Sequence, residues 1–248
     1  MPKRLLLAGE TWFSYGVHIK GFSAYGTGTY DEGQKPLVEA LEASGWIVDH
    51  LPNHLATERF PWTLEELDVY DVVVLSDISA DTLQLHPRTF VKGERTVDRL
   101  ALLGEWVRKG GGFAMIGGYM AFSGFEGRGR FGMTPLIDIL PVRTLVGDDR
   151  IEAPAGVVPK VVQNHDLLAE ITGEWPHFLG YNRVIAKDDA SVLMTAGADP
   201  FLVVGEFGKG RSAAFASDCS PHWGSPEFLA WQHYRPFWDS LMSWLAQR

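Results

Sequence analysis

Acidic, hydroxyl and imidazole side chains follow four short apolar runs of this sequence, at the point where each run ends. They are Glu10 and Thr11, Ser76 and Asp77, Tyr119, and the segment from Asp218 to His222. If the four runs are parallel strands, their carboxyl ends meet at one edge of a sheet, where open α/β folds bind ligands. Histidine titrates near neutral pH, and a neighbouring carboxylate fixes its tautomer. The pattern therefore predicts acid and base chemistry by His222 with Asp77 or Asp218 and Glu10.

Each of these residues also has a structural interpretation when it is taken alone. Asp77 or Asp218 could cap the helix or turn that follows it, and His222 could be hydrogen-bonded to a loop. Their coincidence at strand ends favours a functional site. We expect the substrate-binding walls of this site to be formed around the same strand ends, by Thr11, Trp12, Ser76, Gly117, Gly118, Tyr119, Cys219 and Trp223.

Cys219 is the one cysteine of the chain, and it lies three residues before His222. A thiolate nucleophile needs a base within hydrogen-bond distance and a lowered pKa, whereas a lone cysteine is more often a small buried apolar residue. One cysteine also excludes an internal disulfide and a multi-cysteine zinc site. A metal held by Glu10, Asp77, Asp218 and His222 is chemically allowed, but no spacing in the sequence demands one.

Several well-known motifs are absent from the sequence. The glycines of residues 110–117 precede an apolar run rather than follow it, so the dinucleotide-binding fingerprint is not met. Walker A, His-Glu-x-x-His, Cys-x-x-Cys and Gly-x-Ser-x-Gly do not occur. We therefore predict no cofactor.

The elements that must position these residues are organised around residues 110–119. Apolar residues at helical spacing over 96–108 end at a glycine cluster, a short strand buried on both faces follows, and Gly117 and Gly118 turn the chain. Further strands are predicted at 3–9, 46–51 and 70–77, a helix at 34–44, a hairpin at 201–216 and a terminal amphipathic helix at 228–247. Glycines and aromatic residues over 13–33 predict an irregular lid, and residues 148–152 a charged loop. The order of elements is that of an α/β fold with a mostly parallel sheet.

Composition limits the class of protein. With 248 residues, 46% of them hydrophobic, the chain suits one α/β domain over residues 1–248. A net charge of -9 argues against binding to nucleic acid or an anionic membrane. No segment approaches the ~20 apolar residues of a membrane span, and we expect a cytoplasmic protein with a small-molecule ligand. Nine tryptophans, several near the two ends, suggest a pocket or a subunit contact, so a homo-oligomer is expected.

The sequence resembles the class I glutamine amidotransferase-like superfamily, and most closely its glutamine amidotransferase branch related to ThuA-like proteins. The resemblance covers nearly the whole chain, and its most specific part is the string that ends in Pro221-His222-Trp223. The other residues that carry it are 70–77, 110–119, 140–142 with 148–150, 180–182 and 208–211. It implies a flavodoxin-like three-layer α/β/α sandwich.

The sequence departs from this superfamily at its reacting group. Members carry a Gly-x-Cys-x-Gly elbow, whose cysteine attacks the glutamine amide, and a later His-x-Glu. Here the elbow positions are Gly117, Gly118 and Tyr119, and Gly224 lies two residues after His222. Two hypotheses follow. One is a hydrolase or related enzyme that acts on a small polar metabolite through His222 and the carboxyl groups, and the other is a metabolite-binding or assembly module on the same fold.

Overall fold

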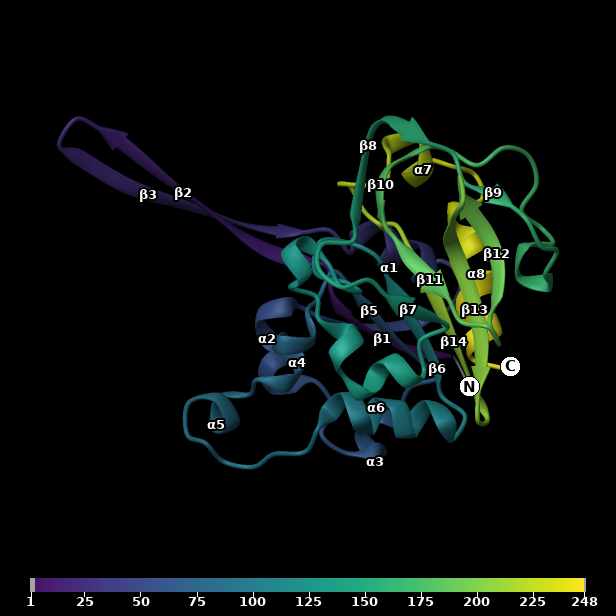
Figure 1. Cartoon of the computed structure of the whole chain (residues 1–248), viewed down its shortest axis with the longest axis horizontal. Helices are drawn as coiled ribbons and strands as arrows, with labels where there is room; N and C mark the ends of the chain where they lie inside the picture. Colours follow the sequence, from purple (N-terminus) through teal and green to yellow (C-terminus); the bar gives the residue numbers. More distant parts are fainter. Residues whose placement is uncertain (1–2, 248) are drawn as a thin grey trace.

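The computed structural model describes residues 3–247, and its centre is an eight-stranded sheet of order β4-β1-β5-β6-β14-β13-β12-β9 (Figure 1). The first five strands in this order are parallel, and β13, β12 and β9 continue the sheet antiparallel. The strands are β1 Arg4–Gly9, β4 Ile47–Leu51, β5 Val72–Ser76, β6 Gly112–Ile116, β9 Lys160–Val161, β12 Ser191–Ala196, β13 Asp199–Phe207 and β14 Gly210–Phe215. Every residue of β5 and β6 is buried, which explains their unbroken apolar sequences.

Helices cover both faces of this sheet. Helices α1 Lys35–Glu42 and α8 Tyr234–Leu245 contact each other on one face. The second group, α2 Asn53–Arg59, α3 Leu64–Leu67, α4 Ala80–Gln84 and α6 Arg99–Arg108, packs together on the other. The result is the flavodoxin-like three-layer arrangement that the family resemblance implied. The longest described helix has 12 residues. No helix of the described residues is long and apolar enough to cross a bilayer.

Smaller elements surround the sheet. Two short antiparallel pairs join β10 Phe178–Asn182 to β8 Arg150–Val157, and β11 Val184–Ala186 to β7 Val142–Thr144. The remaining helical turns are α5 Pro87–Phe90, α7 Pro226–Leu229, η1 Phe125–Gly127, η2 Phe131–Met133, η3 Pro135–Asp138 and η4 Asp166–Leu168. The predicted loop at 148–152 is wrong in part, because β8 begins at Arg150 and Asp149 is buried. The terminal helix is interrupted after Leu229 and begins again at Tyr234.

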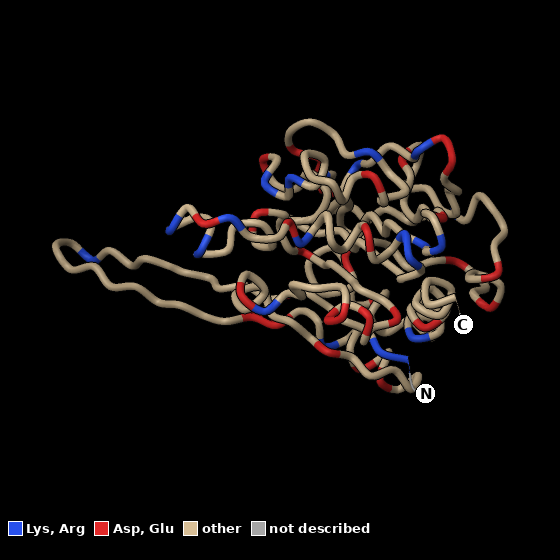
Figure 2. The backbone as a smooth tube through the Cα atoms, turned by 90° about the horizontal axis from the view of Figure 1, so that it is seen from below, with Lys and Arg blue, Asp and Glu red and all other residues tan. Residues whose placement is uncertain are grey.

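The predicted lid at 13–33 is also wrong. Strands β2 Thr11–Lys20 and β3 Ser23–Glu32 form a regular antiparallel hairpin with ten paired positions, which projects away from the body of the protein (Figures 1 and 2). The mixture of glycines and aromatic residues suggested irregular structure, but successive residues of each strand instead lie on opposite faces of a two-stranded ribbon. We call this hairpin, residues 11–32, the arm.

Candidate active site at the strand ends

A cavity of about 360 Å³ opens beyond the carboxyl ends of β1, β5, β6 and β14. This is the edge at which the sequence pattern predicted a site. The residues that line it are Glu10, Thr11, Trp12, Asn53, Asp77, Tyr119, Met120, Asp218, Pro221 and His222. Three carboxyl groups and one imidazole thus face one small space, and no lysine or arginine of the described chain is among the lining residues.

Three of these residues have strained backbones. Glu10, Asp77 and His222 have φ angles of 59°, 42° and 141°, in the region that side chains normally avoid. Glu10 and Asp77 each come directly after a central strand, and the Glu10 amide donates to the Ser76 carbonyl at 3.0 Å. Strain of this kind persists only where surrounding structure enforces it, and it concentrates at functional sites.

The turn after β6 has no room for a side chain at position 118. Gly118 has a φ of 140°, and a Cβ atom built there would lie 2.7 Å from Asp77 Oδ1. The Gly118 amide donates to Asn182 Oδ1 at 3.0 Å, and Asn182 Nδ2 donates back to the Gly118 carbonyl at 3.1 Å. The carboxyl group of Asp77 therefore occupies the space that a side chain at position 118 would need.

Asp77 and His222 influence each other's charge across the cavity. Asp77 Oδ1 accepts a hydrogen bond from the Met120 amide at 2.7 Å. Burial raises the pKa of Asp77, while that amide and the charge of His222 act in the opposite direction. Burial lowers the pKa of His222, and the negative charge of Asp77 partly offsets this. His222 is therefore mainly neutral at pH 7 and able to accept a proton.

The His222 ring also approaches a second carboxyl group and two aromatic rings. Its Nδ1 lies 3.6 Å from Asp218 Oδ2, and 37% of the side chain is exposed. The ring centroid is 4.4 Å from that of Tyr119, edge to face, and 5.1 Å from that of Trp223, stacked. Glu152 accepts from the Tyr119 hydroxyl at 3.0 Å and from Trp223 Nε1 at 3.1 Å, which holds both rings in place.

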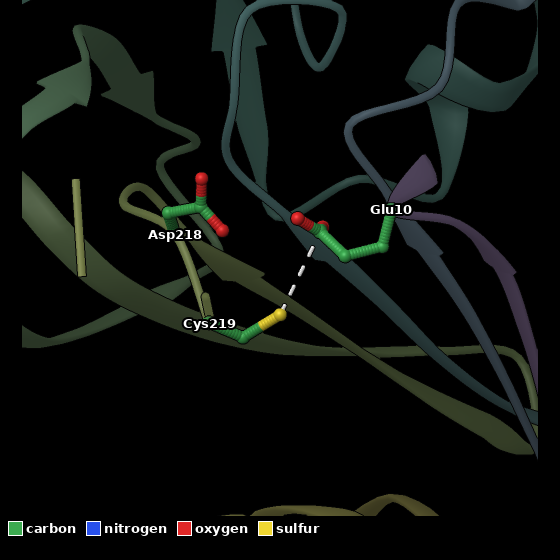
Figure 3. Close-up of side chains that lie close together, drawn as sticks. All are labelled: Glu10, Asp218 and Cys219. Atoms are coloured by element: carbon green, nitrogen blue, oxygen red, sulfur yellow. Dashed lines mark hydrogen bonds between the residues drawn. The ribbon is translucent and has the colours of Figure 1, made fainter. Parts of the chain in front are cut away.

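Glu10 lies at the centre of a buried hydrogen-bond cluster (Figure 3). Its carboxyl group accepts from the hydroxyl groups of Ser76 and Ser220, the latter at 2.6 Å, and from the Cys219 thiol at 3.9 Å. The Ser220 hydroxyl is also 3.1 Å from Asp218 Oδ1. Burial raises the pKa of Glu10 well above its ordinary value, and the charges of Asp218 and Asp77 add to this.

Asp218 has a similar environment. Burial, and then the charge of Asp77, raise the pKa of Asp218 well above its ordinary value, although the Ser220 amide donates to it at 3.0 Å. The site thus combines a histidine whose pKa is lowered with carboxyl groups whose pKa values are raised. Such a pairing supplies a base and an acid at the same pH.

The thiol of Cys219 is not placed as a nucleophile. It is fully buried, and burial together with the charges of Glu10 and Asp218 raises its pKa well above the ordinary value. The ligand atoms of Glu10, Asp218 and Cys219 lie within 4.8 Å of one another and could reach one ion. Binding would require the thiol and both acids to lose their protons together, and the hydrogen bonds of Ser76 and Ser220 account for the arrangement without an ion.

The structure places the predicted site residues in two layers. Those at the cavity wall are Glu10, Thr11, Trp12, Asp77, Tyr119, Asp218 and His222, and those behind it are Ser76, Gly117, Gly118, Cys219 and Trp223. Sequence reasoning missed Asn53, whose Nδ2 donates to the Thr11 and Asp77 carbonyls at 2.6 and 3.2 Å. Asn53 follows the predicted strand at 46–51 by two residues, so the strand-end argument would have found it.

The parallel sheet, the strained strand ends and the glycine turn after β6 define a protein of the class I glutamine amidotransferase-like fold. The chain belongs to the family GATase1_like, described as "Putative glutamine amidotransferase", whose model matches residues 4–247. A search of curated proteins found no match.

Solved structures similar to this chain include two from Salmonella typhimurium. "Cytoplasmic Protein STM3548" has 39% identity and a TM-score of 0.94 over 97% of this chain and 98% of its own. "Cytoplasmic Protein STM1381" from strain LT2 has 41% identity and a TM-score of 0.94 over 98% and 99%. A ThuA-like protein from Parabacteroides merdae has 13% identity and a TM-score of 0.58 over 99% and 90%, which shows a shared fold.

Proposed function

We propose that this protein is an enzyme, a hydrolase or a close relative of one, that acts on a small polar metabolite without a covalent thiol intermediate. The observation that carries this proposal is the position of Asp77, whose carboxyl group lies against Gly118 and lines the same cavity as His222, whose pKa it influences. The chain would thus retain the location of the family's site while replacing a nucleophile by an acid–base pair.

The charges at the cavity limit the substrate. Its wall carries Glu10, Asp77 and Asp218 and has no lysine or arginine to hold a carboxylate or phosphate. The aromatic rings of Trp12 and Tyr119 provide apolar surface beside these acids. We infer a neutral or cationic substrate with hydroxyl, amine or amide groups, such as an amide or a sugar derivative. Free glutamine, which bears an α-carboxylate, fits this wall poorly.

In the proposed hydrolysis, neutral His222 takes a proton from a water molecule, whose oxygen bonds to the electrophilic carbon of the substrate. The bond from that carbon to the leaving nitrogen or oxygen breaks, and the leaving atom receives the proton of the Asp218 carboxylic acid. Asp77 stabilises the imidazolium that forms. Burial and the charge of Asp77 keep the pKa of Asp218 high, and the Ser220 hydroxyl links Asp218 to Glu10. Proton transfer from imidazolium to Asp218 then restores the starting state.

The cellular location is proposed from relatives. Two solved structures that share about two-fifths of their residues with this chain are titled cytoplasmic proteins. We propose the same location for this protein.

A ligand screen tests the proposed function. Thermal unfolding of wild type, His222→Ala and Asp77→Asn would be followed with neutral and cationic amides, amino sugars and glutamine, and compounds that stabilise the protein would then be assayed for turnover. His177→Ala is the matched control, because His177 is similarly exposed but does not line the cavity. We expect a stabilising ligand for wild type and the control, with turnover lost in both site variants. Glutamine hydrolysis, or turnover that survives in His222→Ala, contradicts the proposal, and a ligand that binds without turnover supports a binding module instead.

A further inference from the structure

The Ser220 hydroxyl lies between two carboxyl groups but has only one hydrogen to donate. Its oxygen is 2.6 Å from Glu10 Oε1 and 3.1 Å from Asp218 Oδ1, and the Pro221 carbonyl is a longer alternative at 3.4 Å. If both acids were ionised, one carboxylate oxygen would face a lone pair of the hydroxyl oxygen. Because the side chains of Glu10, Asp218 and Ser220 are buried, such a contact costs free energy. Two hydrogen bonds at Ser220 therefore need a further proton on one of the acids.

The contacts of Glu10 show which of its oxygens can carry this proton. Oε2 accepts from the Ser76 hydroxyl, and from the Cys219 thiol at 3.9 Å. Within residues 3–247, Ser220 is the one hydrogen-bond partner of Oε1. A proton on Oε1 would be donated to Ser220, and the hydroxyl of Ser220 would then be free to donate to Asp218.

The other two acids of the cavity have donors that Glu10 lacks. Asp77 accepts from the Met120 amide at 2.7 Å, and Asp218 accepts from the Ser220 amide at 3.0 Å. An amide only donates, so it favours the ionised form of a carboxyl group, whereas a hydroxyl group also accepts from an acid. Burial, and then the charges of Asp218 and Asp77, raise the pKa of Glu10. Glu10 is thus the most favourable of the three positions for a buried proton.

The bond between Glu10 and Ser220 is covered by the chain. Gly33 packs directly against it, since a Cβ atom built on Gly33 would lie 2.9 Å from both Glu10 Oε1 and Ser220 Oγ. On the far side of Ser220, Asp218 Oδ2 lies 3.6 Å from His222 Nδ1, and both of these residues line the cavity. A proton that leaves Glu10 through Ser220 therefore reaches Asp218 without entering solvent.

We propose that Glu10 holds a proton on Oε1 and supplies it to Asp218 through the Ser220 hydroxyl. In the resting state Glu10 donates to Ser220, Ser220 donates to Asp218 Oδ1, and Asp218 keeps its own proton on Oδ2 beside His222. The Glu10–Ser220 hydrogen bond then runs in the opposite direction from the one that an ionised Glu10 accepts. The use of this proton rests on the proposed function, whereas its presence on Glu10 requires no substrate.

The transfer balances within the proposed hydrolysis. When the leaving atom takes the Oδ2 proton of Asp218, the Ser220 O–H bond breaks and its proton bonds to Asp218 Oδ1. The Glu10 O–H bond breaks in the same step, and its proton restores the Ser220 hydroxyl, so the negative charge moves from Asp218 to Glu10. The imidazolium of His222 then protonates Asp218 Oδ2, and the reverse transfer returns a proton to Glu10. Glu10 and Ser220 act through Asp218 and are positioning residues.

The first test is the infrared spectrum of the free protein at pH 7. A carboxylic acid has a C=O stretch at higher frequency than the bands of a carboxylate. Glu10 is the one buried glutamate of residues 3–247, so ¹³C labelling of glutamate carboxyl groups should shift an acid band of the wild type. Glu10→Gln should remove that band, and Glu105→Gln, at an exposed ion pair with Lys109, should leave it. The labelling result holds even if a variant fails to fold. The absence of a glutamate acid band, or its survival in Glu10→Gln, overturns the proposal.

The second test is the link between the two acids. The charge of Asp218 raises the pKa of Glu10, so the Glu10 band should disappear at a lower pH in Asp218→Asn than in wild type. The other titratable groups around Glu10, unchanged between these two proteins, are Asp77, Cys219, His222 and Tyr234. Ser220→Ala removes the shared hydroxyl and should shift both acid bands. The same pH dependence in both proteins, or unchanged bands in Ser220→Ala, overturns the proposal.

Turnover separates this proposal from the proposed function. The amide of Glu10→Gln can still donate to Ser220 but has no acid proton to transfer. With a substrate from the ligand screen, kcat should fall by part of the ~10²–10⁴-fold that a positioned acid contributes, while KM stays unchanged. Unchanged kcat overturns the transfer. If wild type turns over no compound, the proposed function fails and the transfer with it, whereas the infrared spectra still decide whether Glu10 holds the proton.

Discussion

The carboxyl group of Asp77 excludes any side chain from Gly118. A Cβ atom at position 118 would lie 2.7 Å from Asp77 Oδ1 and 2.8 Å from Asp77 Cβ. The two residues come from the ends of neighbouring strands, β5 and β6, so the strand register of the sheet fixes their contact. This contact explains why position 118 carries no side chain.

Gly118→Cys should therefore be destabilising and should not create glutaminase activity. Backbone strain at a φ of 140° and overlap with Asp77 together predict a loss of about 2–5 kcal/mol in the free energy of unfolding. Denaturant unfolding of Gly118→Ala and Gly45→Ala separates the two causes. Gly45 also has a positive φ, of 89°, but no atom within 4 Å of its Cβ position, so its variant should lose about 1–2 kcal/mol. Equal losses at the two positions would contradict the steric explanation.

Titration of His222 should reflect its burial and its carboxylate neighbour. Burial lowers the pKa of His222 below its ordinary 6.5, and the charge of Asp77 raises it. NMR titration should place the midpoint below 6.5 in wild type and lower still in Asp77→Asn. If a substrate is found, the acid limb of kcat/KM should move in the same direction. Because the pKa of His222 is lower in the folded state, neutral His222 contributes fully to the free energy of unfolding above pH 6.5. This contribution is lost as the pH falls through the lowered pKa. A midpoint that rises in Asp77→Asn would refute the pairing.

Asp218→Asn should stabilise the protein at alkaline pH. Folding raises the pKa of Asp218 above its ordinary value near 3.8. The protonated carboxyl group therefore contributes to the free energy of unfolding below pH 3.8, and this contribution is lost as the pH rises through the pKa of the folded state. Asparagine keeps an acceptor for the Ser220 amide and carries no charge. We expect Tm at pH 8 to increase by a few degrees, since 1 kcal/mol corresponds to ~2–4 °C in a chain of this size. Asp188, which is almost fully exposed, is the control, and Asp188→Asn should leave Tm unchanged. A lower Tm for Asp218→Asn would mean that the carboxylate is stabilised by contacts that outweigh its burial.

The sequence predicts the parallel half of the sheet well, because β1, β5 and β6 are apolar on both faces and their ends are marked by polar residues or glycine. It does not predict the arm, since alternation between residues such as Tyr15 and Gly16 resembles irregular aromatic-rich sequence until the pairing of β2 with β3 is known. Nor does it predict the exclusion of Gly118 by Asp77. That relation depends on two backbone angles and on strand register, which a linear pattern does not contain.

Asn182 is expected to support the turn after β6 and the cavity beside it. Its side chain is fully buried, bonds the Gly118 amide and carbonyl, and donates to Asp149 Oδ1 at 2.8 Å. Asn182→Ala leaves buried polar groups without partners, so the free energy of unfolding should fall by about 2–4 kcal/mol. Asn164 is exposed, and Asn164→Ala should change the free energy by less than about 0.5 kcal/mol. If Asn182→Ala is as stable as that control, water or a relaxed backbone must satisfy Gly118 and Asp149, and the turn does not depend on this amide.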